Sequence, residues 1–234
     1  GVVGDPEREV AFDLLEEWRV KASIACLESN KEVSALGCFH KLFEASLIHP
    51  TSLRLAMNER LQQIRTNEQL AYFEDEVANL ERDVVLLEKS ASSIPADFLE
   101  TAVIIRDKLD KESKCIVFVT DKDLASELTS YLSKQFPDSV KLNTGEPDLV
   151  EHFMAGTTIK VLVCDQSSEE GLNLQFSNAC IVHFDVPLSV NRIEQRIGRL
   201  DRLGIRMPKA LSVVLHPTSG YEQKWVKCVT DSIG

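Results

Sequence analysis

Four arginines recur at intervals of three or four residues between positions 191 and 204, in the run NRIEQRIGRLDRLG. They are Arg192, Arg196, Arg199 and Arg202. A guanidinium keeps its charge near neutral pH and presents a rigid fork of N–H donors, which suits the oxygens of a polyphosphate. Side chains at this spacing share one side of a helix and can converge on one anion. The run therefore predicts a phosphate site, the alternative being an exposed basic helix paired with Glu194 and Asp201.

The chain carries no loop that would complete such a site. Nucleotide hydrolases hold the phosphates with a GxxxxGK[ST] loop and bind Mg²⁺ through an acidic pair. The 234 residues contain no GxxxxGK[ST]. The run Glu74-Asp75-Glu76-Val77 resembles the acidic motif, but it lies within a helical apolar pattern and follows no apolar strand, which predicts a solvated helix face. We therefore expect any nucleotide to be gripped elsewhere.

Two regions of different pattern must position the arginines. Residues 7–110 carry apolar residues at steps of three and four, which predicts amphipathic helices. The expected helices cover residues 7–28, 33–49, 52–65, 68–90 and 97–109. From about residue 111, short apolar runs alternate with helical segments, and these runs cover residues 115–119, 140–142, 159–164, 180–184 and 210–215. This alternation favours a parallel α/β sheet over residues 96–234, preceded by a helical portion over residues 1–95.

Charge is unevenly distributed along the chain. The whole protein carries a net charge of -11, which argues against a wholly basic nucleic-acid-binding domain. Residues 1–110 account for -9 of it, whereas residues 188–227 carry a net +5. A locally basic face on an acidic body is compatible with phosphate binding at one site.

Composition excludes several other classes of protein. The six cysteines show no CxxC pairing and the five histidines no ligand spacing, so we expect no metal site and a reduced compartment. No run approaches about 18 apolar residues, and the N-terminus lacks a basic region followed by an apolar run, so neither a membrane span nor a secretory signal is expected. These features favour a cytoplasmic protein.

Polar residues follow three of the expected strands. In open parallel sheets, ligands sit at the carboxyl ends of the strands. Thr120 and Asp121 follow the first strand, the run DQSSEEGLNLQ follows the third, and the fourth leads into the arginine run. One sheet edge would thus gather Thr120, Glu169, Glu170, Gly171, Asn173, Gln195, Arg199 and Arg202.

Two of these runs together resemble a known family. SEEGLNLQ (168–175) followed by EQRIGRLDRLG (194–204) resembles motifs V and VI of superfamily-two helicases, specifically the Swi/Snf-like translocases. The residues of the second run are most similar to those of the RapA-like bacterial branch, whose founding member is an RNA-polymerase-associated ATPase. The resemblance covers residues 96–234, and FEASLIHPTSLR (43–54) resembles a segment that precedes the lobe in that family. It implies a RecA-like lobe, the helicase C-terminal domain of the P-loop NTPase type, behind an α-helical protrusion.

The resemblance assigns the chemistry to particular residues. Arg199 and Arg202 match the motif VI arginines, which reach across a cleft to the γ-phosphate of ATP. Because the matched pattern assigns the phosphate contact to these two, Arg192 and Arg196 are not expected to make one. Gln195 would order the attacking water or the phosphates. ATP and Mg²⁺ would be held mainly by a first lobe that this chain lacks, so the chain is expected to be a half-site, neither hydrolysing ATP nor unwinding a duplex alone.

Further residues match positions that face the nucleic acid. Glu170, Gly171 and Asn173 would couple the state of the nucleotide to the nucleic-acid groove. Four residues resemble positions that touch the sugar–phosphate backbone: Thr120, Asn143, Thr144 and Gly145. For residues 143–145 the alternative is an ordinary turn after a strand.

The sequence departs from the family pattern at two places. Ser168-Glu169 stands where the family has a Gly-Ser pair, and Ile205 replaces a glutamine.

We expect a second motor lobe of an ATP-dependent translocase or helicase, with double-stranded DNA as the favoured track and RNA left open. Its partners would be the first lobe of the same protein and a complex such as RNA polymerase, with nucleoid association in a bacterium. The alternative function, which the two departures from the family pattern motivate, is that of a degenerate lobe acting as a protein-interaction module.

Overall fold

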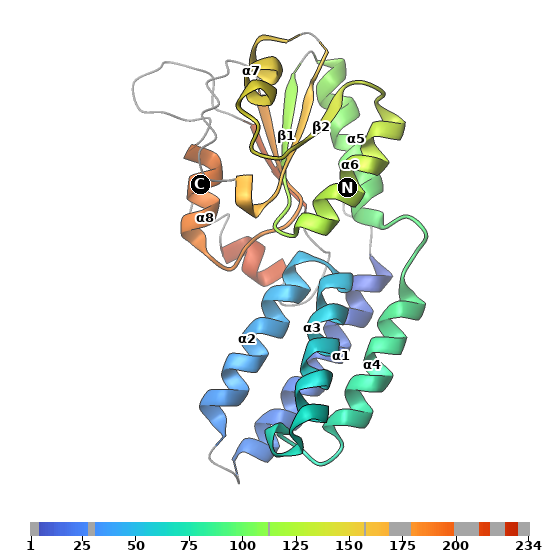
Figure 1. The fold of residues 1–234 in the computed structure, drawn as a ribbon, viewed down its shortest axis with the longest axis vertical. Coiled ribbons are helices and arrows are strands. Elements are labelled where there is room, and N and C mark those ends of the chain that lie inside the picture. The colour runs from blue at the N-terminus through green and yellow to red at the C-terminus, as the bar shows by residue number, and fades with distance from the viewer. Residues whose placement is uncertain are drawn as a thin grey trace. The chain divides into compact units, whose positions relative to one another are not determined.

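The chain divides into two compact units. The computed structural model describes residues 5–27, 31–111, 113–156, 158–168, 179–198, 211–215 and 223–228. The first unit comprises residues 1–93 and 217–228, and the second comprises residues 94–216 and 229–234 (Figure 1). The first is a helical unit and the second an α/β unit, and each is described by itself.

Within residues 5–90, the described part of the helical unit contains a ring of four helices, and residues 223–228 of the same unit are also helical. The helices of the ring are α1 (Pro6–Cys26), α2 (Glu32–Ile48), α3 (Pro50–Thr66) and α4 (Glu76–Ser90), with a short 3₁₀ turn, η1 (Glu68–Leu70), before α4. Each helix contacts the next along the chain, and α1 also contacts α4, which closes the ring (Figure 1). Short connections between sequential helices make neighbours antiparallel, as in a four-helix bundle.

Local signals explain where these helices begin. Asp5 precedes α1, and its Oδ1 accepts hydrogen bonds from the backbone N–H groups of Glu7 at 3.0 Å and Arg8 at 3.5 Å. His49 precedes α3, and its Nδ1 accepts from the backbone N–H of Thr51 at 3.2 Å. Each cap is followed by a proline, which suits the first helical position because its missing N–H would lack a partner there.

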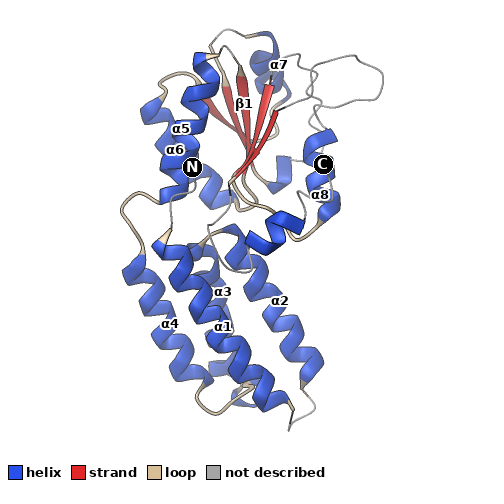
Figure 2. Cartoon of the chain, turned by 180° about the vertical axis from the view of Figure 1, so that it is seen from behind, coloured by secondary structure: helices blue, strands red, loops and turns tan. Residues whose placement is uncertain are grey.

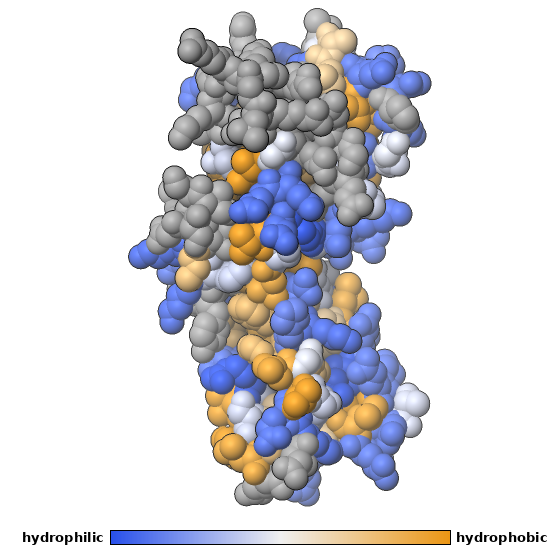
Figure 3. Space-filling view, turned by 90° about the vertical axis from the view of Figure 1, so that its left-hand side faces the viewer, coloured by the Kyte–Doolittle hydropathy of each residue, from blue (hydrophilic) through white to orange (hydrophobic). Residues whose placement is uncertain are grey.

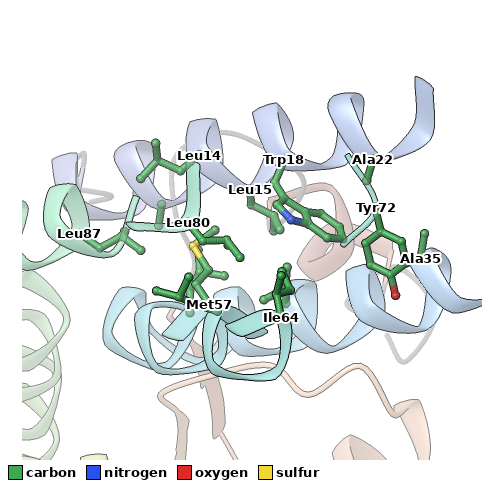
Figure 4. Close-up of a cluster of buried hydrophobic side chains, with 14 of the residues drawn as sticks. Leu14, Leu15, Trp18, Ala22, Ala35, Met57, Ile64, Tyr72, Leu80 and Leu87 are labelled. Carbon is green, nitrogen blue, oxygen red and sulfur yellow. The ribbon is translucent and has the colours of Figure 1, made fainter. Parts of the chain in front are cut away.

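The core of the helical unit lies inside the ring. Trp18 of α1, Met57 and Ile64 of α3, and Leu80 of α4 point toward one another and are almost fully buried (Figure 4). These residues recur at helical spacing, which is why the apolar pattern of the sequence found the helices.

One predicted helix is shorter than the sequence pattern indicated, and one predicted surface is buried. The pattern favoured a single helix over residues 68–90, whereas α4 begins only at Glu76. Glu74 and Asp75 are exposed as expected, but Glu76 is 0% exposed, so its assignment to a solvated face is wrong. The Glu76 carboxylate accepts the backbone N–H of Tyr72 at 2.7 Å, which fixes the turn that separates η1 from α4.

A buried ion pair satisfies the charge of Glu76. Arg60 of α3 donates to Glu76 from Nε to Oε1 at 3.0 Å and from Nη2 to Oε2 at 3.2 Å. The indole N–H of Trp18 donates to Oε1 at 3.1 Å, and the Arg60 guanidinium lies 4.3 Å from the centre of the Tyr72 ring. A buried carboxylate is tolerated only when paired and hydrogen-bonded, and these donors meet that condition.

The α/β unit is built on a five-stranded parallel sheet, which confirms the fold class expected from the alternating runs. The strands are β1 (Lys114–Phe118), β2 (Val140–Asn143), β3 (Val161–Cys164), β4 (Ala179–His183) and β5 (Leu211–Val214), in the order β2-β3-β1-β4-β5. The helices are α5 (Ala96–Asp110), α6 (Lys122–Gln135), α7 (Pro147–Ala155) and α8 (Val190–Gly198), with a 3₁₀ turn η2 (Gln166–Ser168) after β3. Strands buried on both faces read as continuous apolar runs, which made them visible in the sequence.

Helices cover both faces of the sheet. Figure 2 shows α5 and α6 on one side of the strands and α7 and α8 on the other. Phe153 of α7 packs in a buried cluster with Ile116 and Phe118 of β1, and Arg196 of α8 lies over the same Phe118 ring. In the described part of the chain, no helix is long and apolar enough to cross a membrane.

Candidate nucleotide-side edge of the sheet

The carboxyl ends of the two central strands bring together residues far apart in sequence. β1 and β4 pair in register, with Phe118 opposite His183. Two residues beyond each, Thr120 and Asp185 meet. The backbone N–H of Thr120 donates to Oδ2 of Asp185 at 2.6 Å, and the Thr120 hydroxyl donates to Oδ1 at 2.7 Å. The parallel register therefore creates a polar link at the sheet edge where ligands bind in such folds.

Arg196 of α8 completes this link. Its Nη1 donates to the backbone carbonyl of Asp185 at 2.9 Å, and its Nη2 donates to Asp185 Oδ1 at 3.2 Å and to the Thr120 hydroxyl at 3.1 Å. The guanidinium also lies 5.3 Å from the centre of the Phe118 ring. Arg196 is 0% exposed, and Asp185 is buried as well. We call Thr120, Asp185 and Arg196 the edge clamp, because it ties β1, β4 and α8 together.

Helical spacing explains why Arg196 turns inward. Ile193 lies one turn earlier on α8 and is buried, whereas Gln195 is exposed. Residues three apart share a helix face, so the face of α8 that Ile193 buries also carries Arg196 toward the sheet. The helix begins after Ser189, whose carbonyl accepts the backbone N–H of Arg192 at 3.1 Å.

A neutral histidine lies next to the edge clamp. Burial, and then the nearby charge of Arg196, lower the pKa of His183 to about 3. Its Nε2 lies 3.0 Å from the Ser212 hydroxyl of β5, and its ring stacks at 6.3 Å from that of Phe118. A histidine with this pKa is uncharged at neutral pH, so His183 adds no positive charge to this edge.

The segment after β3 begins with an ordered carboxylate. Asp165 Oδ1 accepts from the Ser167 hydroxyl at 2.6 Å and from the Ser168 backbone N–H at 3.0 Å. Burial alone would raise the pKa of Asp165, but the hydrogen bonds from Ser167 and Ser168 outweigh it and lower that pKa. The ionised carboxylate thus anchors η2, from which the chain runs on toward the predicted coupling residues.

Several predicted site residues lie outside the described residues. They are Glu170, Gly171, Asn173, Arg199 and Arg202. Gln195 is described and lies exposed on α8, beside the buried Arg196. Its assignment to the reacting phosphate, like that of the two arginines, stays a prediction.

The residues predicted to touch nucleic acid differ in exposure. Asn143 is 3% exposed, and its Oδ1 accepts the backbone N–H of Gly145 at 3.1 Å. Gly145 has φ +85°, a conformation that glycine adopts without strain. The geometry at 143–145 is that of a side-chain-stabilised turn, which leaves Thr144 and Gly145 exposed. The hydroxyl of Thr120 is engaged within the edge clamp.

Sequence reasoning did not identify Asp185 as a site residue and set Arg196 aside. The signal for Asp185 was a carboxylate directly after a buried strand. The signal for Arg196 was its spacing of three from Ile193, which places both residues on one face of the helix. Both oxygens of Asp185 accept hydrogen bonds from protein donors. Among the described residues, no cluster of His, Cys, Asp or Glu could hold a metal ion.

Comparisons with known proteins identify the α/β unit. The family model of the helicase conserved C-terminal domain matches residues 95–204. The RNA polymerase-associated protein RapA of Pseudomonas fluorescens is 32% identical over 123 residues, which are 50% of this chain and 13% of that protein. RapA of Vibrio campbellii is 51% identical over 45 residues, 19% of this chain and 4% of that protein. The chain thus spans a small part of the length of these curated relatives.

Solved structures agree on the fold. The C-terminal part of the Fun30 ATPase domain has a TM-score of 0.59 at 11% identity, covering 95% of this chain and 85% of that one. The Pyrococcus furiosus Hef helicase domain has a TM-score of 0.58 at 16% identity, covering 97% of this chain and 57% of that one. With the family match and the partial RapA match, residues 95–204 of this chain resemble the helicase C-terminal, RecA-like lobe of superfamily-two proteins of the Swi/Snf type.

Proposed function

We propose that this chain is the second motor lobe of an ATP-dependent nucleic-acid translocase or helicase. The observation that carries the proposal is the placement of α8. The edge clamp anchors this helix at the carboxyl edge of the parallel sheet, and the chain passes from Gly198, the last residue of α8, directly into Arg199. The match to a helicase C-terminal domain runs through the same segment and ends at residue 204.

In this proposal, Arg199 and Arg202 serve ATP that another lobe holds together with Mg²⁺. Charge builds on the phosphoryl oxygens during transfer, and an arginine finger that neutralises it contributes about 10³–10⁵ in rate in nucleotide hydrolases. Gln195, which is exposed on α8, would help order the water or the phosphates. Closure of the two lobes around ATP brings the arginines in, and release after hydrolysis withdraws them.

The nucleic-acid track is also part of the proposal. Thr144 and Gly145 are exposed after β2, at the carboxyl edge of the sheet, where they would contact a sugar–phosphate backbone. Double-stranded DNA is the favoured track, and RNA is the alternative. RapA is named for its association with RNA polymerase, and we extend such a partner, and a cytoplasmic, nucleoid-associated location, to this chain as proposals.

The test uses the intact protein that contains both lobes. Arg199→Ala and Arg202→Ala should each lower the kcat of nucleic-acid-stimulated ATP hydrolysis by about 10³-fold, while the affinity for ATP changes little. Arg192→Gln, on the same run but without a predicted phosphate contact, is the matched control and should keep its turnover. The present chain alone should show no hydrolysis. Full turnover in both alanine variants would refute the assignment of the fingers.

A second function is favoured by the surface of the helical unit. Several large aliphatic side chains are exposed where α1 ends and α2 begins, including Leu27 at 81% and Val33 at 88%. Figure 3 shows hydrophobic surface interspersed with hydrophilic surface over this unit. Exposed aliphatic groups on an acidic unit suit a protein-interaction module on a degenerate lobe. Absence of both ATP binding and stimulated hydrolysis in the intact protein would favour this module over the motor.

A further inference from the structure

Two of the four arginines that looked equivalent in the sequence, Arg192 and Arg196, have different surroundings in the structure. Arg196 is completely buried, whereas Arg192 of the same helix is partly exposed. The Arg196 guanidinium donates to three acceptors that belong to the ends of two strands: the carbonyl and carboxylate of Asp185 and the hydroxyl of Thr120. A side chain held in this way is not placed to contact a nucleotide that arrives from another lobe.

The same contacts make Arg196 the point at which α8 is joined to the sheet. Thr120 lies 76 residues before Arg196, and Asp185 lies 11 residues before it. Asp185 in turn receives two hydrogen bonds from Thr120, so each member of the edge clamp contacts the other two. Bonds of this kind in a buried setting are strongly directional, and they fix the position of the helix relative to both strands.

The position of Arg196 along α8 explains how its contacts with the sheet could affect the predicted arginine fingers. Arg196 lies two residues before Gly198, where the helix ends, and three residues before Arg199. We propose that Arg196 is a positioning residue: through Asp185 and Thr120 it fixes the orientation of α8, the helix that directly precedes Arg199 and Arg202 in the sequence. The proposal rests on the function proposed above, because it presumes that those two arginines serve ATP.

The central test compares two buried arginines in the intact two-lobe protein. Arg196→Lys keeps the positive charge but removes the fork that joins carboxylate, carbonyl and hydroxyl. It should lower kcat by about 10- to 100-fold, since a misplacement of about 1 Å can cost about 100-fold in rate. KM for ATP should stay within about threefold, because the residue does not bind ATP. Arg60→Lys, which disrupts the buried pair of the helical unit, is the control and should leave turnover unchanged.

A double-mutant comparison shows whether Arg196 acts through the fingers. In a background of Arg199→Ala with Arg202→Ala, Arg196→Lys should have little further effect on kcat, because the side chains that it positions are gone. An equal loss in both backgrounds would overturn the positioning role. Full turnover in Arg199→Ala with Arg202→Ala would instead refute the proposed function.

Two further measurements decide the matter if Arg196→Lys folds poorly or the proposed function fails. Thr120→Val removes the bridging hydroxyl and Thr120→Ser retains it, so only the valine variant should lose kcat, measured at saturating nucleic acid. In the present chain, amide hydrogen exchange over residues 190–198 should be faster in Arg196→Lys and Thr120→Val than in Thr120→Ser. Unchanged exchange in both variants would overturn the proposal whatever the role of Arg199 and Arg202.

Discussion

Both units of this protein bury an arginine against a carboxylate, and the two pairs differ in what surrounds them. Arg60 and Glu76 lie within the helical ring, where Trp18 and Tyr72 supply further donors to the carboxylate. Arg196 and Asp185 lie at the carboxyl edge of the sheet, where α8 leads into the predicted fingers. The same kind of ion pair therefore joins helices within a core in one unit and, in the proposal above, orients α8 before the predicted fingers in the other.

The physical chemistry of buried ion pairs explains how one interaction can have both uses. Desolvating two charges offsets much of their attraction, so such a pair contributes little net stability over an apolar pair of the same size. Removing one partner, however, leaves an uncompensated buried charge. The pair instead fixes the relative orientation of its two side chains, because the planar guanidinium donates well-aligned hydrogen bonds in only a few geometries.

The largest effect is expected when the Arg60–Glu76 ion pair of the helical unit is broken. Arg60→Ala should lower the free energy of unfolding of that unit by about 3–5 kcal/mol, because it leaves Glu76 buried without its counter-ion. Arg60→Met combined with Glu76→Gln should recover part of the loss, since glutamine keeps an oxygen that can accept from Trp18. Urea unfolding followed by tryptophan fluorescence measures both. A cost under about 1 kcal/mol for Arg60→Ala would contradict the comparison.

A smaller effect is expected from His183, beside the edge clamp of the α/β unit. Burial lowers the pKa of His183 to about 3, below the value of about 6.5 expected in the unfolded chain. Below about pH 6.5 the unfolded chain therefore takes up a proton that the folded chain does not. The stability contributed by the neutral imidazole is present above that pH and falls by about 1.4 kcal/mol per pH unit between roughly pH 6 and pH 4.

Chemical unfolding of the present chain at several pH values measures this dependence. His183→Gln should remove that part of the slope, because glutamine does not titrate. His40→Gln, at an exposed position of the helical unit, is the matched control and should keep the wild-type slope. Equal slopes in all three proteins would show that His183 is already accessible to protons in the native state.

The smallest expected effect is a change in the rate of cysteine labelling in one unit but not in the other. Burial raises the pKa of Cys38, in the helical unit, to about 11 and that of Cys115, in β1, to about 12. Cys115 is buried and Cys38 is partly buried, and their raised pKa values keep both as thiols; labelling is therefore fastest when a unit opens, because the thiolate is the nucleophile. Arg60→Lys should speed the labelling of Cys38 by about tenfold for each 1.4 kcal/mol lost, and leave Cys115 unchanged. Alkylation followed by mass spectrometry reads both sites, and equal acceleration would mean that the two units open together.

The sequence predicted the fold well where local patterns decide it. Apolar runs such as 115–119 and 180–184 became β1 and β4 within one or two residues, because strands buried on both faces leave a continuous apolar signature. The pattern failed at residues 68–90, where apolar spacing continued across a real break. That break depends on the bond between Tyr72 and Glu76, which no apolar periodicity records.

For the candidate site, the sequence showed the arginine run but did not show that its arginines differ in burial and in the contacts they make. Helical spacing alone placed Arg196 and Arg199 near one another without distinguishing a buried side chain from a phosphate contact. Glu76 shows the same limit, since a glutamate among acidic neighbours is usually solvated, and its burial requires Arg60 and Trp18 from two other helices. In both cases the missing information was the identity of the partner.

The sequence by itself determined the parallel α/β lobe, the helical unit before it and the resemblance to helicase C-terminal domains, because apolar periodicity and motif spacing are local properties. Only the tertiary structure decided that Arg196 is buried and that Asp185 and Thr120 are its acceptors. The reason is that β1 and β4 must pair in register before Thr120 and Asp185 can meet. Contacts across 76 residues exist only once the sheet has formed, and they distinguish the buried Arg196 from the partly exposed Arg192 of the same helix.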